Sequence, residues 1–388
     1  MPSSRSSAPS TPWLAAGFLL AGLGTAILGP VLPYVAKMWH LSDANSGSLF
    51  FFKFVGAFLG GVAVASHLRR SITLGSLLCC VGFGGFAVAP HAWLGAIALL
   101  VGGFGLGQII AATNIVAGQR YTRHTGSALA TLNFFWALGA VATGLLAAAL
   151  LPRYGLRAPV LLFAALFAVN AVGGWISSTT SGTTSEEAPA ASIALPTREF
   201  IVFASLLLLY GGLETCLTSW LTTFALRFSD AHVLGGQSAV VLFWASLTVG
   251  RLCAGALLRF VSERFMQLAS VFLAFFMIVT LSLTQHAWML SALCIALGLT
   301  LAAYFPAIFG MLLQKSPPPR VAGIVLASSG LGAAGFPWLM GVVSTATHSL
   351  RKGMLVPAGV ALVMLVIGAL WLPTQKPTGE AEANVVSS

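Results

Sequence analysis

Charged residues are scarce in this chain of 388 residues. Lys, Arg, Asp and Glu together make up 7% of it, against about 25% in soluble globular domains. Nine carboxylates and 19 basic side chains cannot cover the surface of a soluble globule of this size, whereas hydrophobic residues amount to 57%. The composition therefore excludes an ordinary cytosolic enzyme and a disordered chain, and it predicts a polytopic membrane protein.

Cysteine is also rare, and the five cysteines all lie inside apolar segments: Cys79, Cys80, Cys216, Cys253 and Cys294. We expect free thiols that pack as small hydrophobic side chains, which excludes a disulfide scaffold. The sequence shows no histidine pair with metal-ligand spacing and no Ser/His/Asp or paired-carboxylate arrangement. We therefore expect no metal, no cofactor and no enzymatic activity.

Long unbroken apolar runs take the place of the alternating ten-residue segments that are typical of a β-barrel. A membrane-spanning helix needs about 20 apolar residues, and only helices can satisfy the backbone of such runs in lipid. We predict an all-α membrane protein with twelve transmembrane helices. They lie near residues 13–38, 46–67, 72–90, 92–119, 125–151, 156–177, 198–227, 233–259, 264–284, 287–314, 320–346 and 353–372.

The predicted helices form two pseudo-symmetric six-helix bundles. Shifting the first half by 189 residues places Gly22 on Gly211 and Gly61 on Gly250, and such internal symmetry is typical of transporters whose halves rock around a central site. The expected organisation is an N-terminal tail, a first bundle, a Ser/Thr/Ala/Pro-rich linker, a second bundle and a polar tail. Their bounds are 1–12, 13–177, 178–197, 198–372 and 373–388.

The basic residues lie mainly in short loops between the apolar runs. Eleven of the 19 fall on the side of the two termini and six on the opposite side, while Lys53 and Arg251 lie within predicted helices. An excess of Lys and Arg marks the cytoplasmic side, so we expect both termini in the cytoplasm and the protein in the cell (inner) membrane. This loop pattern also argues against a nucleic-acid partner, although the net charge is +10.

Two six-helix halves, a central linker and basic loops after the second and eighth helices resemble the major facilitator superfamily. The family's loop signature is partly present as Gly60-Gly61-Val-Ala-Val-Ala-Ser66-His67-Leu-Arg69-Arg70, without its acidic residue. The resemblance implies alternating-access transport. It also implies gating or ion-pair roles for Arg69, Arg70 and Arg251. Separately, we expect a monomer.

Three strings resemble a narrower branch, the fucose/glucose/galactose permeases. They are Leu132-Asn133-Phe134-Phe135-Trp136-Ala-Leu-Gly139, Tyr210-Gly211-Gly212-Leu213-Glu214 followed by Trp220, and Phe243-Trp244-Ala-Ser246-Leu-Thr248-Val-Gly250-Arg251. This resemblance implies a hexose or related polyol as the substrate. Fucose-type permeases carry an acidic residue in each of the first and fourth helices for proton coupling. This chain offers only Thr25, and Gln108 with Asn114, at those places.

Ionisable groups inside a bilayer cost about 2.5–3.5 kcal/mol or more, which makes each a candidate for function. Glu214 is the carboxylate that lies deep in a predicted helix, and it is a candidate substrate acceptor and proton-coupling group, or else half of a static ion pair. Arg251 is the expected ion-pair partner of Glu214. It could instead bind an anionic substrate or belong to a gate. Lys53 either lines a cavity or snorkels to the interface.

Sugar binding needs aromatic faces and side chains that hydrogen-bond to hydroxyl groups. The candidates are Gln108, Asn114, Asn133, Trp136, Trp220, Trp244 and Tyr304, although each could instead serve helix packing. Pro30, Pro33 and Pro306 predict kinks in the first and tenth helices. The sequence thus predicts a secondary or facilitative transporter of a hexose or polyol, with proton coupling through Glu214 as a hypothesis. The alternative is an organic-anion, drug or metabolite transporter that uses Lys53 and Arg251.

Overall fold

The computed structural model describes residues 11–64, 68–120, 125–178, 194–229, 233–257, 261–315 and 317–372. Within those ranges the secondary structure is helical, with fifteen helices. The expected tails, the middle of the expected linker and the loop residues Ser66 and His67 lie outside the described residues.

The first half contains seven helices. They are α1 (Thr11–Ala26), α2 (Leu28–Met38), α3 (Asp43–Val62), α4 (Leu68–Val88), α5 (Ala92–Arg120), α6 (Thr125–Tyr154) and α7 (Arg157–Ser178). The second half contains α8 (Thr197–Phe228), α9 (Val233–Leu257), α10 (Glu263–Leu283), α11 (Ala287–Ala302), α12 (Tyr304–Gln314), α13 (Pro319–Thr347), α14 (Leu350–Gly353) and α15 (Leu355–Trp371).

These helices make twelve spans, because α1 with α2, α11 with α12, and α14 with α15 each form one crossing. The prediction of an all-α protein with twelve spans is therefore confirmed. Ten of the crossings are long and apolar enough to span a membrane by length and composition. The remaining two crossings are α3, which carries Lys53, and α9, which carries Arg251. Helix α3 packs against α13 of the second half, and α9 packs against α6 of the first.

Two predicted kinks appear as interruptions of the helix. The first span breaks at Ile27 and the tenth at Ala303, each three residues before a proline, at Pro30 and Pro306. A proline has no N–H to donate, and its ring clashes with the carbonyl four residues earlier. The break therefore falls one residue after that carbonyl.

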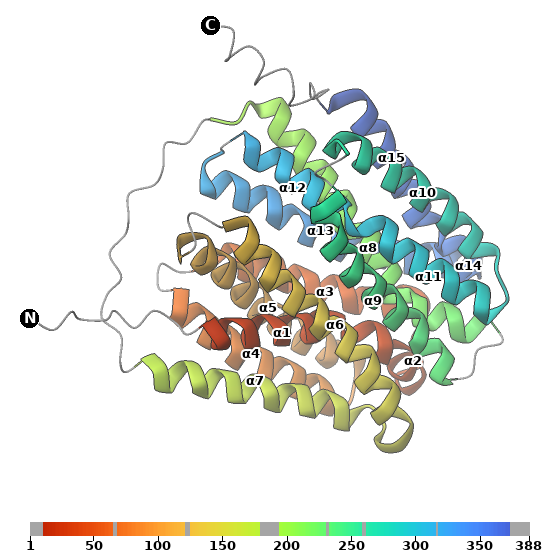
Figure 1. Cartoon of the computed structure of the whole chain (residues 1–388). Helices are drawn as coiled ribbons and strands as arrows, with labels where there is room; N and C mark the ends of the chain where they lie inside the picture. Colours follow the sequence, from red (N-terminus) through yellow and green to blue (C-terminus); the bar gives the residue numbers. More distant parts are fainter. Residues whose placement is uncertain are drawn as a thin grey trace, which may run out of the picture.

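The two halves lie side by side, with the start of α1 and the end of α15 toward one end of the molecule (Figure 1). We call the opposite end, where α2 leads into α3 and α8 ends, the distal end. Three helix pairs join the halves: α3 with α13, α6 with α9, and α2 with α8. Gly47 of α3 lies against the Trp338 backbone, and Gly29 of α2 lies against the Thr218 carbonyl, so small residues allow the close approach.

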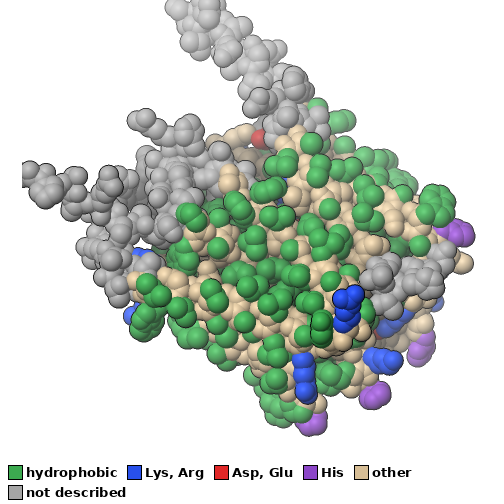
Figure 2. Space-filling model, turned by 60° about the horizontal axis from the view of Figure 1, so that its bottom comes forward, with side chains coloured by type: hydrophobic (Ala, Val, Ile, Leu, Met, Phe, Trp, Pro, Cys, Tyr) green, Lys and Arg blue, Asp and Glu red, His purple; other side chains and the backbone are tan. Residues whose placement is uncertain are grey.

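Large hydrophobic side chains cover much of the surface in the view of Figure 2. Examples are Val169, Trp175, Leu283 and Leu370, each at least two-thirds exposed. Such a surface would aggregate in water, whereas lipid chains cover it without cost. The exposed apolar belt therefore agrees with a bilayer as the surrounding solvent.

Candidate functional site

An ion pair inside the second half occupies the position expected from the sequence. Glu214 lies near the middle of α8 and Arg251 on α9, with 3.4 Å between Arg251 Nη2 and Glu214 Oε1. The side chains are 12% and 17% exposed. A pair that is nearly buried avoids most of the cost of an isolated charge, and each of the two side chains keeps a small exposed fraction.

Two tryptophans from opposite halves lie next to this ion pair. The Trp136 ring on α6 and the Trp244 ring on α9 meet edge to face, with centroids 5.2 Å apart. The Arg251 guanidinium lies 5.9 Å from the Trp136 ring centre, within the range of a cation–π contact. We call Trp136, Glu214, Trp244 and Arg251 the central cluster. It links α6 of the first half with α8 and α9 of the second.

The central cluster contains hydrogen-bond donors without acceptors. Trp244 is 3% exposed, and neither its Nε1 nor Arg251 Nε has a hydrogen-bond partner among the described residues. Buried donors are normally paired. A ligand oxygen within hydrogen-bond distance would satisfy such a donor.

An aromatic stack extends the central cluster along α8. Tyr210 lies one helical turn before Glu214, and its ring stacks on Tyr304 with a centroid distance of 4.9 Å. The Tyr210 hydroxyl donates to the Leu301 carbonyl at 3.4 Å, and it also interacts with Glu214 and Arg251. Tyr210 was not among the candidates from sequence, although its spacing of four from Glu214 places both on one helix face.

Several other predicted side chains are committed to packing contacts. Gln108 donates to the Ala63 carbonyl at 3.3 Å. Trp220 is fully buried and donates to the Pro337 carbonyl at 3.1 Å. Tyr304 is fully buried and accepts a hydrogen bond from Gln267 at 3.3 Å. These three do not join the central cluster, except that Tyr304 supports Tyr210.

The remaining polar candidates lie apart. Lys53 is fully buried in the first half, where it donates to the Thr25 carbonyl next to the break between α1 and α2. Asn133 is half-buried and lies three residues before Trp136 on α6, so both share a helix face. Asn114 is half-buried on α5. At the start of α4, Arg69 is half-buried and Arg70 is exposed.

The distal end contains a polar lock that the sequence did not single out. Arg227 at the end of α8 makes two hydrogen bonds of 2.7 Å to the Asp43 carboxylate at the start of α3. Ser344 on α13 donates to the same carboxylate at 2.6 Å, and the Ala44 N–H donates to Thr345 Oγ1 at 2.9 Å. We call Asp43, Arg227 and Ser344 the distal lock, because it closes this end of the interface between the halves.

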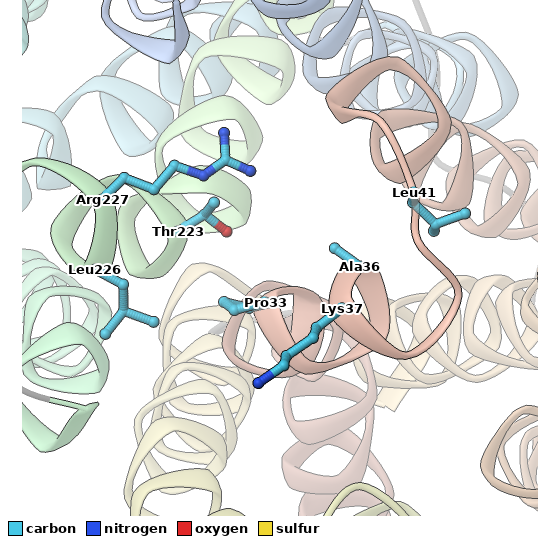
Figure 3. A pocket seen from close by; sticks show the side chains of 7 residues that line it. All are labelled: Pro33, Ala36, Lys37, Leu41, Thr223, Leu226 and Arg227. Carbon is cyan, nitrogen blue, oxygen red and sulfur yellow. The ribbon is translucent and has the colours of Figure 1, made fainter.

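Burial raises the pKa of Asp43, but the hydrogen bonds from Arg227 and Ser344 and the charge of Arg227 outweigh burial, so the pKa lies below its usual value. The carboxylate is therefore charged at neutral pH. Two cavities flank the lock. One, of about 290 Å³, lies between α2 and α8 (Figure 3), and the other, of about 410 Å³, is lined by Asp43, Ser344 and His348.

Two helical halves, an ion pair inside the second half and polar contacts that close one end are features expected of a membrane transporter. The sequence profile of the Major Facilitator Superfamily matches residues 14–323, which is most of the chain. The chain belongs to this superfamily of secondary transporters of small solutes, and it is not an enzyme.

Two curated relatives show how broad the similarity is. Bypass of stop codon protein 6 of Saccharomyces cerevisiae is 22% identical over 387 aligned residues, which cover 84% of this chain and 75% of that protein. The niacin transporter NiaP of Acinetobacter baylyi is 28% identical over 146 residues, 36% of this chain and 33% of NiaP. The chain thus aligns with only about a third of the niacin transporter.

Solved structures share the fold across several transporters. An inward-facing, unoccupied bacterial homologue of the human lysosomal transporter Spinster superposes with a TM-score of 0.75 and 14% identity, covering 94% of this chain and 100% of that one. The Escherichia coli fucose:proton symporter superposes with a TM-score of 0.63 and 15% identity, covering 94% and 98%. The resemblance to the superfamily is confirmed, and these neighbours do not single out the sugar-permease branch.

Proposed function

We propose that the central cluster binds a neutral polyhydroxylated solute, with a hexose as the leading candidate. The observation that carries this proposal is a charge-balanced Glu214–Arg251 pair whose guanidinium lies against Trp136, which in turn packs on Trp244. A carboxylate accepts hydrogen bonds from hydroxyl groups and a guanidinium donates them. The tryptophan rings offer apolar faces to the C–H surface of a sugar, as expected of a pocket with few placed polar groups.

The position of the central cluster between the halves also supports alternating access. Trp136 belongs to the first half, whereas Glu214, Trp244 and Arg251 belong to the second. A solute held by both halves is released from one of them when they rock apart. Its binding energy can then favour one arrangement of the halves over the other.

We extend the proposal to proton coupling through Glu214, which rests on its contact with Arg251. A solute that inserts between Glu214 and Arg251 weakens their attraction, so proton uptake by Glu214 accompanies binding. This is a proposal about Glu214 alone, because Thr25, Gln108 and Asn114 stand where fucose-type permeases carry acidic groups.

The test is uptake and counterflow of radiolabelled hexoses in proteoliposomes that contain the purified protein. Glu214→Gln should abolish accumulation driven by a pH gradient and retain exchange, and Trp136→Ala should raise the apparent KM by tenfold or more. Lys352→Gln, an exposed cation at the distal end, is the matched control and should leave both unchanged. Full pH-driven accumulation by Glu214→Gln would overturn the coupling proposal.

A small organic anion is the second candidate, and one observation favours it. Trp244 Nε1 and Arg251 Nε are donors without acceptors among the described residues, and an anionic oxygen would satisfy both. A relative named as a niacin transporter points the same way. In this version Glu214 competes with the substrate for Arg251. Glu214→Gln should then tighten nicotinate or benzoate binding, whereas a hexose carrier should lose affinity for its sugar.

A further inference from the structure

The cavity between α2 and α8 at the distal end has the chemistry of an anion site. Its polar lining comes from Lys37 on α2 and from Thr223 and Arg227 on α8, and its volume is about 290 Å³. In Figure 3 the Lys37 side chain extends past Pro33, and its ammonium group points away from the Arg227 guanidinium. Two cations from opposite halves still line one cavity.

The charges around this cavity are not balanced. Arg227 is paired with Asp43, whereas Lys37 is exposed and has no ion-pair partner among the described residues. Further basic side chains lie at the same end of the molecule: Arg153, Arg157, Arg351 and Lys352. Lys, Arg and His side chains gather toward this end in Figure 2. Such a basic rim concentrates anions near the cavity.

Thr223 provides an independent sign of a missing ligand. Its side chain is 4% exposed and lines the cavity, and its hydroxyl has no hydrogen-bond partner in the part of the chain that the structure describes. A buried hydroxyl without a partner is destabilising. An acceptor atom in the cavity would satisfy this donor.

The rest of the lining is apolar and limits the class of ligand. Pro33, Ala36, Leu41 and Leu226 complete the wall. A phosphate ion would leave this apolar surface unused, whereas the hydrocarbon part of an organic acid would cover it. The lining therefore favours a carboxylate with an apolar body over an inorganic anion.

We propose that this distal cavity binds a small organic monocarboxylate, which Lys37, Thr223 and Arg227 hold, in competition with Asp43 for Arg227. The site is separate from the central cluster, and the proposal does not depend on which solute the central cluster carries. Because Arg227 also belongs to the distal lock, occupancy weakens the contact that closes this end.

The experiment is calorimetric titration of benzoate into the purified full-length protein in neutral detergent at low salt. Lys37→Gln should weaken binding at least tenfold and Thr223→Val severalfold. Asp43→Asn should tighten binding severalfold, because Arg227 loses its competing partner. Lys352→Gln removes the same charge at the same end outside both cavities, so it should bind benzoate as the wild type does.

The melting temperature of each variant shows whether its altered affinity comes from binding or from folding. If Lys37→Gln folds poorly, Thr223→Val provides a second test of the site. Wild-type affinity in both Lys37→Gln and Thr223→Val would overturn the proposal. An equal loss in Lys352→Gln would show bulk surface charge instead of a site. Loss of benzoate affinity in Arg251→Gln without any loss in Lys37→Gln would place benzoate at the central cluster. Phosphate that binds as tightly as benzoate would contradict the proposed role of the apolar lining.

Discussion

At the scale of single residues, the Glu214–Arg251 pair is a stabilising contact whose two side chains keep some exposure. Removing one partner from a buried pair leaves the other charge uncompensated, whereas removing both is far less costly. The pair here keeps a small exposure of 12% and 17%, so water can relieve part of that cost. Its strength is therefore below that of a fully enclosed pair.

We expect Glu214→Gln and Arg251→Gln each to lower the free energy of unfolding by at most about 3 kcal/mol. The double variant should lose clearly less stability than the sum of the two single losses. Thermal melting of the four proteins in one detergent measures this coupling. Strictly additive losses would show that the two side chains do not interact and would remove the basis of the proposed coupling mechanism.

Lys53 shows why a residue type alone does not reveal its role. The sequence allowed a cavity-lining cation or a snorkelling side chain. The structure instead buries the ammonium group completely against the Thr25 carbonyl, beside the Phe54 ring at 5.0 Å. A backbone carbonyl near a helix break is a hydrogen-bond acceptor that only the tertiary arrangement brings to Lys53.

At the scale of helices, small residues decide how closely α3 and α5 approach. A Cβ atom on Gly103 would lie 1.9 Å from the Lys53 carbonyl oxygen, whereas a Cβ on the adjacent Gly102 would have its nearest neighbour at 3.6 Å. The first distance forces the two helices apart, and the second is an ordinary contact. The two neighbouring glycines therefore have different structural roles.

We expect Gly103→Ala to destabilise the protein by about 1–3 kcal/mol, the usual range for overpacking. Gly102→Ala should be neutral or slightly stabilising, because alanine favours the helix over glycine by about 1 kcal/mol. Melting temperatures of the two variants in the same detergent give the comparison. Equal effects would contradict the close contact of α3 with α5.

The break in the tenth span offers a second test at this scale. Pro306→Ala restores an N–H group and removes a ring clash, so α11 and α12 should join more continuously. We expect slower transport if the break serves as a hinge between conformations. Pro337→Ala is the control, because Pro337 lies inside the unbroken α13. Unchanged transport by Pro306→Ala would show that the break does not act in the cycle.

At the scale of the whole molecule, the distal lock holds α3, α8 and α13 together across the interface between the halves. The Arg227 and Asp43 side chains are 41% and 12% exposed, and exposed ion pairs contribute about 1 kcal/mol or less. Asp43→Asn should therefore shift the population toward a distally open form by about fivefold at most. Distances between spin labels on α3 and α8, with Lys352→Gln as the control, measure this shift.

The pH dependence of the lock follows from the lowered pKa of Asp43. A carboxylate with a lowered pKa contributes its stability above its usual pKa, and that contribution is lost as the pH falls through the lowered value. Distal closure should therefore be constant between about pH 5 and 8 and weaken only below about pH 4. The same label distances, followed in acid, test this, and opening between pH 7 and 5 would contradict it.

The sequence by itself determined the class of protein and the number of crossings. Scarce charge and long apolar runs leave a chain no stable arrangement except helices in a bilayer. Pro30 and Pro306 marked the two helix breaks, whereas α2 continues through Pro33, where a kink was also predicted. The sequence also predicted that Glu214 and Arg251 pair, because they lie on consecutive helices and intramembrane charges are rare. Each of these features depends on local composition or on neighbours along the chain.

Only the tertiary structure decided which distant residues meet. Trp136 and Trp244 come from different halves, and so do Asp43 and Arg227. Their contacts depend on how two bundles rotate and pack against each other, which no local pattern encodes. The same packing committed Gln108, Trp220 and Tyr304 to structural hydrogen bonds. It left the Trp244 and Thr223 donors without an acceptor among the residues that the structure describes. Burial and geometry, which arise only when the helices assemble, separate the polar groups that hold the fold from those that remain available to a ligand.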